Sequence, residues 1–241
     1  MNTFKSALRL LPVVGLLLAA GTQESAKAAL LSETVFAFTT SGYNTVLELE
    51  TAGGQLRLDA IGRGWYESGG SSNGSSSSNN YIAGICGTED VCNGGDGVLR
   101  NWFIFDLEGV LGPVTAATLY LDVPFPDGFL SPQGSETYTL YTLDLGTAAI
   151  AGGAGLPGYI DLGDGTVYGS RAYTAVDIGN GPGIVLNASA LTAINNAIGG
   201  DFGLGGTVTS LNFGQGGEVP EPATVVLMGA GLALLALRRR K

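Results

Sequence analysis

The amino-acid sequence contains no histidine, and its three lysines lie in the terminal segments outside residues 29–218. The segment between these ends therefore has neither a histidine nor a lysine. Without these side chains it cannot form a Ser-His-Asp, Ser-Lys or Cys-His catalytic system, and histidine-based zinc, copper or iron sites are excluded as well. A pair of carboxylates, as used in glycoside hydrolysis, is the catalytic arrangement that remains.

Basic charge is also scarce in residues 29–218. This segment contains four arginines and 19 acidic residues, which gives a net charge of −15, whereas the whole chain has a net charge of −10. Nucleic-acid binding needs clustered Lys and Arg to displace counterions from phosphates, so we expect no nucleic-acid partner. Neutral glycans, cationic groups and divalent cations remain as partners.

Cysteine is limited to Cys86 and Cys92, which five residues separate. In an exported protein this spacing predicts one local disulfide, with two free thiols as the alternative. Two thiolates without a histidine are too few ligands for a structural zinc site.

Long apolar runs occur only near the two ends of the chain. At the N-terminus, Lys5 and Arg9 precede the apolar residues 10–20, and the small residues Ala26 and Ala28 flank Lys27. This order is typical of a secretory signal peptide with its cleavage site. We therefore predict a signal peptide over residues 1–28 and a mature chain that begins at Ala29.

The C-terminal 23 residues, 219–241, have three parts. Pro220, Glu221 and Pro222 form a stiff segment, residues 225–237 are apolar, and the chain ends with four basic residues: Arg238, Arg239, Arg240 and Lys241. By the positive-inside rule the basic residues form a cytoplasmic anchor. Residues 223–237 as a helix span about 22 Å, short for a hydrocarbon core of roughly 30 Å. A transient sorting signal fits this length better than a permanent anchor helix, which is the alternative.

This tail resembles the PEP-CTERM protein-sorting signal of Gram-negative bacteria, with Pro220, Glu221 and Pro222 at the positions of the signature tripeptide. The resemblance implies processing near the tripeptide by an exosortase, a membrane protease-transpeptidase. It also implies export across the inner membrane, transient anchoring through a C-terminal transmembrane helix, and final location at the cell surface or in the extracellular matrix. The resemblance indicates a destination and no activity.

Residues 29–218 are long enough for one domain, and their pattern predicts an all-β fold. Short runs rich in β-branched and aromatic residues alternate with turn signals, which is typical of an antiparallel β-sandwich or jelly roll. The predicted strands are 34–39, 45–49, 55–60, 98–107, 117–123, 137–143, 173–178, 184–186 and 207–213. One short helix is predicted at 187–198, with Asn187 as its N-cap. Residues 68–80, almost all Ser, Gly and Asn, predict a flexible loop, with glycosylated serines as the alternative.

Residues 100–107 and 116–121 resemble a hairpin of jelly-roll domains in exported bacterial proteins, some of which are carbohydrate-binding modules. The pattern is an arginine, Arg100, then a hydrophobic strand that ends in Phe-Asp-Leu, then a strand of the type Ala-x-Leu-x-Leu. Since Arg100 and Asp106 share a strand face, we expect a structural ion pair between them. Trp102 and Ile104 belong to the same face.

Three other groups are candidates for chemistry. Glu48 and Glu50 share a strand face and are the carboxylate pair of a hydrolase hypothesis. Glycine-rich loops place Asp161 near Asp164, and Asp90 near Asp96, as candidate calcium ligands, although an Asp-Gly pair is first of all a turn signal. The aromatic residues that we considered for stacking on sugar rings are Trp65, Tyr66, Tyr81, Tyr159 and Tyr168, with packing as the alternative role.

The sequence as a whole predicts a non-enzymatic exported protein of the surface or matrix, associated with exopolysaccharide or biofilm and able to bind glycan. A secreted carboxylate-pair glycan hydrolase and a purely structural matrix protein without a specific ligand are the alternatives. We expect no cofactor, with calcium as the one ion that the loops could bind.

Overall fold

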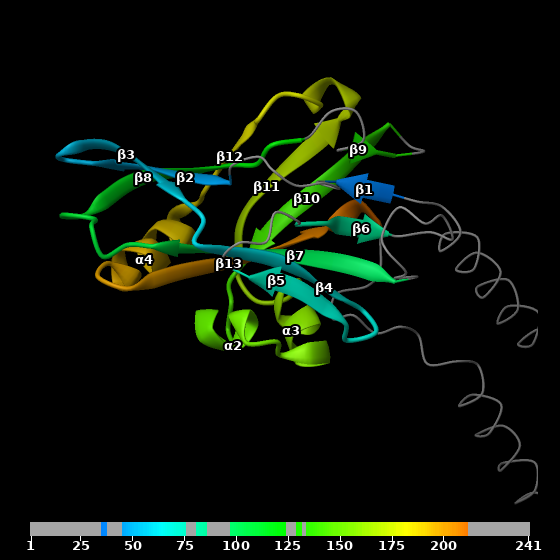
Figure 1. Cartoon of the computed structure of the whole chain (residues 1–241). Coiled ribbons are helices and arrows are strands. Elements are labelled where there is room, and N and C mark those ends of the chain that lie inside the picture. The colour runs from blue at the N-terminus through cyan, green and yellow to red at the C-terminus, as the bar shows by residue number, and fades with distance from the viewer. Residues whose placement is uncertain are drawn as a thin grey trace, which may run out of the picture. The chain divides into compact units, whose positions relative to one another are not determined.

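The computed structural model describes residues 35–37, 45–75, 81–85, 97–123, 129–131 and 134–211. All of them belong to one compact unit, Glu33–Gly217, and the second unit, formed by Met1–Ser32 and Glu218–Lys241, lies outside these ranges. Two antiparallel sheets contain about half of the described residues and form the framework of the fold (Figure 1). The prediction of an all-β fold with two sheets is therefore confirmed.

The smaller sheet has four strands in the order β12-β8-β2-β3. Their bounds are β2 Val46–Thr51, β3 Gly54–Asp59, β8 Val114–Tyr120 and β12 Gly183–Val185. Alternation along β2 buries Leu47 and Leu49 completely and turns Glu48 and Glu50 to the opposite face. One face of this sheet thus belongs to the core and the other is polar.

The larger sheet has nine strands, in the order β11-β10-β13-β7-β6-β1-β9 with β4 and β5 attached beside β7. The bounds are β1 Val35–Ala37, β4 Gly62–Glu67, β5 Ser72–Ser75, β6 Ala83–Ile85, β7 Val98–Asp106, β9 Phe129–Leu130, β10 Ser135–Tyr141, β11 Val167–Thr174 and β13 Asp201–Val208. β7 pairs with β4, β6 and β13, so the sheet branches at this strand.

Strand β7 is buried on both faces, since every residue from Leu99 to Phe105 is buried. One set of alternate side chains includes Phe103, whose ring meets that of Tyr81 edge-on at 5.5 Å between centroids. The other set contains Arg100, Trp102 and Ile104, which the sequence correctly placed on one face. A strand covered on both sides explains why this segment reads as an almost continuous apolar run.

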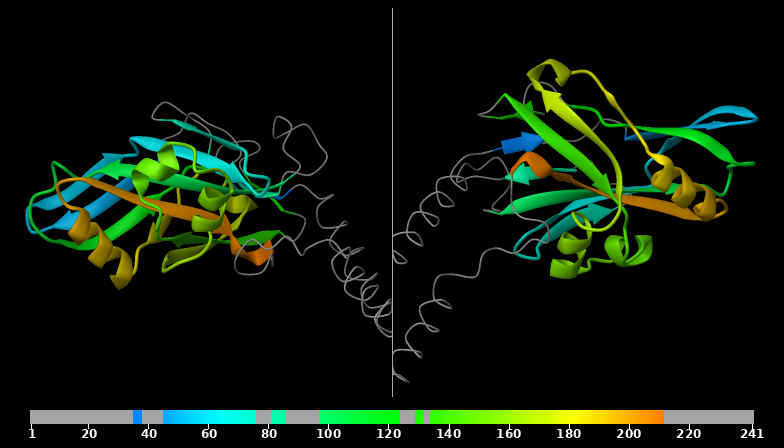
Figure 2. Two further views of the ribbon diagram at one scale, coloured as in Figure 1. Left: turned by 90° about the horizontal axis from the view of Figure 1, so that it is seen from below. Right: turned by 180° about the vertical axis from the view of Figure 1, so that it is seen from behind.

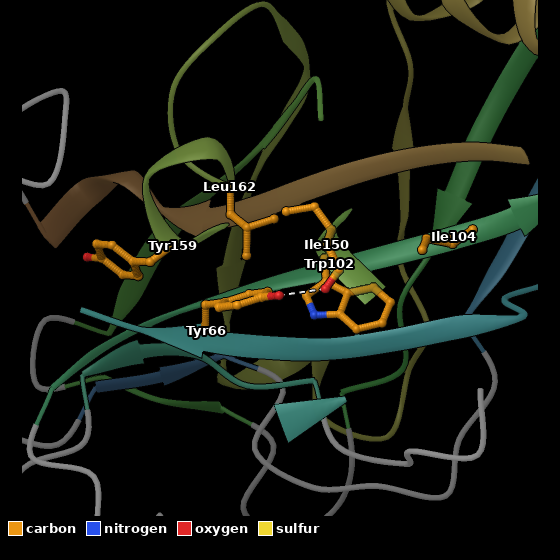
Figure 3. Close-up of a cluster of buried hydrophobic side chains, with 6 residues drawn as sticks. All are labelled: Tyr66, Trp102, Ile104, Ile150, Tyr159 and Leu162. Atoms are coloured by element: carbon orange, nitrogen blue, oxygen red, sulfur yellow. Dashed lines mark hydrogen bonds between the residues drawn. The ribbon is translucent and has the colours of Figure 1, made fainter. Parts of the chain in front are cut away.

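Two short helices, α2 Thr147–Ala151 and α3 Gly155–Asp161, pack on the face of β4 and β7 that carries Trp102. Figure 1 shows them on the side of the larger sheet away from β2, β3 and β8. Figure 3 shows the cluster that joins helices and sheet, which consists of Tyr66, Trp102, Ile104, Ile150, Tyr159 and Leu162. Buried apolar contact, rather than helix propensity, holds these five- and seven-residue helices.

A third helix, α4 Ala188–Ala197, lies alongside β13, as the right-hand view of Figure 2 shows. Its N-cap Asn187 accepts a hydrogen bond from Ala190 N–H at 3.1 Å, and Ala190 and Ile194 face inward. The predicted helix at 187–198 is confirmed, together with its cap.

Strand β13 runs between β10 and β7 and contains three glycines that permit close approach. A Cβ on Gly203 would lie 2.6 Å from Leu143, and one on Gly205 would lie 2.8 Å from Leu162. On the other face, a Cβ on Gly206 would collide with the phenol of Tyr138. Glycine in this strand therefore lets the neighbouring layers touch the backbone.

Several sequence predictions need correction. The strand predicted at 173–178 lies at Val167–Thr174. Residues Ala175–Asp177 form a 3-10 turn, in which the Asp177 side chain accepts a hydrogen bond from the N–H of the N-cap Thr174. The strand predicted at 207–213 in fact spans Asp201–Val208, and Thr209–Leu211 is a 3-10 turn. Its start was missed because glycines in its first part weaken the strand signal in the sequence.

The sequence also missed whole elements. β4, β6 and β9 were not predicted. β5 lies inside the predicted flexible loop 68–80, where the sequence contains no strand signal because the composition of β5 is not typical of a strand and only its pairing with β4 defines it. The prediction of a single helix is wrong, since the described ranges contain three α-helices. Among the described residues no helix is long and apolar enough to cross a membrane.

Candidate functional site

The polar face of the smaller sheet carries the most extensive cluster of charged and hydroxyl groups among our candidates. Arg57 donates to Glu48 at 2.7 Å, and its guanidinium lies over the ring of Tyr120, 5.2 Å from the centroid. The Tyr120 hydroxyl donates to the other oxygen of Glu48 at 3.3 Å. Cross-strand register produces this cluster, because Arg57 and Thr118 lie opposite Glu48 on β3 and β8.

Glu48 and Glu50 share this face, as the sequence predicted. Glu48 is held by Arg57 and Tyr120, and Glu50 is exposed. Burial and the negative charge of Glu48 raise the pKa of Tyr120 above its ordinary value. The arrangement is a hydrogen-bonded ion pair on an open sheet surface.

The aromatic side chains considered for sugar stacking are mostly part of the core. Tyr66, Tyr81, Tyr159 and Tyr168 are all at least 94 % buried, and only Trp65 is partly exposed. Trp65 itself packs against Ile82 and Leu99. The stacking role is therefore wrong for the four tyrosines, and the alternative role in packing is the one that the structure supports.

The candidate calcium loop at Asp161 and Asp164 adjoins the C-terminal end of α3. The carboxylate of Asp161 is buried and accepts the backbone N–H groups of Asp144 at 2.9 Å and Leu145 at 3.2 Å. Burial raises the pKa of Asp161, and the two backbone hydrogen bonds oppose that rise. Asp161 therefore links the turn between β10 and α2 to the end of α3. In the described ranges no three Cys, Asp or Glu side chains are grouped to hold a metal ion.

A hollow of about 280 Å³ lies between the hairpin β4–β5 and helix α2. Its lining includes Tyr66, Ser72, Asn73, Trp102 and Gly152. Residues 70–74 also match the spacing Gly-x-Ser-x-Gly, a hydrolase pattern that our sequence analysis did not note. Here Ser72 begins an edge strand rather than a strand-to-helix turn, and the sequence has no histidine to activate it.

Arg100 is the buried cation of the larger sheet, only 3 % exposed. It donates to the carbonyl oxygens of Tyr159 at 2.9 Å and Ile160 at 3.1 Å, the last turn of α3, and stacks on the Tyr159 ring at 4.2 Å. The expected ion pair with Asp106 is wrong, because six residues of strand place the two about 20 Å apart. Asp106 instead accepts from Glu108 N–H. Burial lowers the pKa of Arg100 from its ordinary value.

Sequence reasoning missed the buried polar residues of the core. Asn101 and Tyr138 are fully buried, and the Tyr138 hydroxyl donates to the Asn101 side chain at 2.5 Å, while Asn101 donates to Tyr81 O at 3.2 Å. Glu136 is also buried and accepts hydrogen bonds from the hydroxyls of Ser131 and Ser210. Asn101, a polar residue in an otherwise apolar strand, is the signal that could have revealed this network.

Several predicted site residues lie outside the described residues. They are the signal-peptide site at Ala26 and Ala28, the cysteines Cys86 and Cys92, the acids Asp90 and Asp96, the tripeptide Pro220, Glu221 and Pro222, and the basic end Arg238, Arg239, Arg240 and Lys241. For these residues the sequence predictions stand as they were made.

Residues 218–241 match the family model described as the PEP-CTERM protein-sorting motif. No curated protein and no solved structure matches the chain, so the resemblance of residues 100–121 to carbohydrate-binding jelly rolls gains no support. The match covers about a tenth of the chain, and it supports an exported protein with a C-terminal sorting signal that an exosortase-type enzyme processes.

Proposed function

We propose that this chain is an exosortase-processed protein whose folded body is a non-enzymatic component of the cell surface or extracellular matrix. The observation that carries the proposal is the sorting motif at residues 218–241, which follows in the sequence a separately folded, acidic β-sandwich. Processing takes place near Pro220, Glu221 and Pro222, and the basic end stays cytoplasmic until then.

The chemistry of the body supports a non-enzymatic role. Residues 29–218 have no histidine or lysine, Glu48 is held in an ion pair, and Asp161 is bound to backbone N–H groups. A general acid or base must reach its substrate within hydrogen-bond distance. The candidate carboxylates of the described body are instead engaged in structural contacts or lie on an open face. The carboxylate-pair hydrolase is therefore the weaker of the two proposals.

We propose that the folded body associates with exopolysaccharide. Because the four tyrosines considered for stacking are buried, contacts with sugar hydroxyls would come from polar side chains of the smaller sheet, such as Glu50 and Thr118. Calcium bridging between acidic protein and acidic polysaccharide is a second way in which such a body associates with a matrix.

The sorting proposal is tested by expressing the full chain in a Gram-negative host with and without an exosortase. We expect loss of the C-terminal segment, measured by intact mass, only when the exosortase is present. Replacement of Glu221 by Ala should leave the full-length chain in the membrane fraction, whereas Glu218→Ala, just outside the tripeptide, should be processed normally. Identical masses in both hosts would overturn the proposal.

The association proposal is tested by co-sedimentation of residues 29–218 with exopolysaccharide, with and without calcium. Saturable binding would support a glycan-binding matrix protein, and its loss on calcium removal would assign the contact to calcium bridging. Absence of binding in both conditions would leave a structural surface protein without a glycan ligand. Release of reducing sugar would support the hydrolase instead.

A further inference from the structure

Strand β3 forms one end of the smaller sheet, and among the described strands it pairs with β2 alone. The two strands are joined by a tight turn at 52–53, and Figures 1 and 2 show this hairpin at the margin of the molecule. In the described part of the chain no strand pairs with the outer edge of β3. Such an edge presents unpaired backbone groups that another strand can bind.

The register identifies the groups that point outward from β3. Ala60 N–H donates to Thr45 O at 3.0 Å, so the pair 45–60 is hydrogen-bonded. Hydrogen-bonded and non-hydrogen-bonded pairs alternate in an antiparallel ladder. The N–H and C=O groups of residues 56 and 58 therefore point to β2, and those of Gln55, Arg57 and Asp59 point to the open edge.

The side chains of β3 give this edge two different faces. Leu56 and Leu58 lie on the inner face and are only half-buried, while the residues opposite them on β2, Leu49 and Leu47, are completely buried. On the outer face Arg57 and Asp59 are exposed and of opposite charge. In the described residues Asp59 has no ion-pair partner, and Arg57 has one, Glu48.

We infer that the open edge of β3 binds the same edge of a second copy of this chain, in a two-fold antiparallel pair centred on Leu58. In that register Arg57 of each copy lies opposite Asp59 of the other, which gives two cross-strand ion pairs. The two Leu58 side chains form the central non-hydrogen-bonded pair, where side chains approach most closely. The two smaller sheets then form one continuous sheet.

Charge selects this register over its neighbours. A pairing centred on Arg57 would place two arginines directly opposite each other, which is destabilising. A further shift in the same direction, to a pairing centred on Leu56, would place Arg57 opposite Gln55 and leave Asp59 opposite the hairpin turn. The sequence of β3 is thus complementary to itself in one antiparallel register.

The pairing involves few residues, so it buries less than the 1,200–2,000 Å² that is typical of a stable interface. It also has to overcome the repulsion between two bodies of charge −15. The dimer is therefore weak in dilute solution and forms where the protein is concentrated. The inference does not depend on the sorting route, and either proposal can fail alone.

The test uses residues 29–218, which include the compact unit Glu33–Gly217, in sedimentation velocity from about 10 μM to 1 mM. Asp59→Arg and Arg57→Glu each place like charges opposite each other, so each alone should weaken association by ~10-fold or more. An equimolar mixture of the two variants restores both ion pairs and should associate like the unmodified chain. Thermal unfolding verifies that each variant is folded.

The matched control is Glu108→Arg, an exposed residue of the β7–β8 turn that changes the net charge as Asp59→Arg does. General charge repulsion predicts that both variants associate more strongly, whereas edge pairing predicts opposite effects. A monomer at every concentration, or association that Asp59→Arg leaves unchanged, would overturn the inference. If Arg57→Glu fails to fold because Glu48 loses its partner, the comparison of Asp59→Arg with Glu108→Arg still distinguishes edge pairing from general charge repulsion.

Discussion

At the scale of single residues, the body depends on buried polar side chains that each hold a particular piece of backbone. Arg100 binds carbonyls in the last turn of α3, Asp161 binds two N–H groups in the turn after β10, and Asn101 binds Tyr138 inside the core. Each buried polar group would be costly if its partner were removed.

Replacement of Arg100 by Met is expected to lower the free energy of unfolding by about 2–4 kcal/mol, because two buried carbonyl groups lose their donors. Arg171→Met, at a half-exposed arginine paired with Asp177, should cost much less. Urea denaturation measures both. Equal costs would show that Arg100 is not a special support for α3.

Asp161 gives a prediction for pH. Its pKa is raised by burial above the ordinary value of 3.8, so the folded state binds this proton more readily than the unfolded state. The contribution of Asp161 to stability is therefore fully present below the unfolded pKa and is lost as pH rises through the higher folded pKa. Asp161→Asn should remove this decline, which unfolding curves at a series of pH values from 3 to 7 would reveal as a changed slope. An unchanged slope would contradict the raised pKa.

At the scale of elements, close approach of backbone decides where strands and helices meet. Gly206→Ala should destabilise the body by about 3 kcal/mol, since the new Cβ collides with the Tyr138 phenol in the middle of β13. Gly200→Ala is the control, because the nearest atom there lies 3.8 Å away. Chemical denaturation compares the two, and similar effects would mean that the core can rearrange around Gly206.

The cap of α4 gives a second prediction at this scale. Asn187→Ala removes the acceptor for Ala190 N–H and the donor to Val167 O, so we expect a loss of about 1–2 kcal/mol. Ser189→Ala, an exposed position in the first turn, should change stability by less than about 0.5 kcal/mol. Thermal unfolding would distinguish a true cap from an ordinary surface residue.

The elements that the sequence predicted and those that it missed differ in how they are stabilised. β2, β3 and the helix α4 have a clear period, and β7 is a long apolar run, so these elements are visible in the sequence. β5 and α2 lack both, because β5 is defined by pairing with β4 and α2 by contact with the Trp102 cluster. Contacts between segments far apart in sequence leave no periodic signal.

The candidate site was predictable in part for the same reason. Alternation placed Glu48 and Glu50 on one face, but it could not reveal that Arg57 and Tyr120 from other strands hold Glu48. Likewise Tyr66 and Tyr159 stand beside glycine-rich segments that read as surface loops. The structure buries both, because Tyr159 lies on α3 and packs with Tyr66 in the cluster between the two short helices and the larger sheet.

At the scale of the whole molecule, the net charge of −15 on residues 29–218 opposes compaction. Screening at an ionic strength of about 0.15 M reduces the Debye length to roughly 8 Å, so added salt should raise the melting temperature by a few degrees. Differential scanning calorimetry between low and physiological salt measures this. A decrease with salt would indicate that ion pairs such as Arg57–Glu48 outweigh the repulsion.

The hydroxyl of Tyr66 donates to Ile150 O and accepts from Ala154 N–H, and so connects strand β4 to the link between α2 and α3. The amide hydrogen of Ala154 should consequently exchange with solvent slowly, although the neighbouring residues 151–153 are exposed. A protease that needs an extended substrate should therefore cleave this link slowly. A single phenol thus protects a glycine-rich segment that would otherwise be open to cleavage.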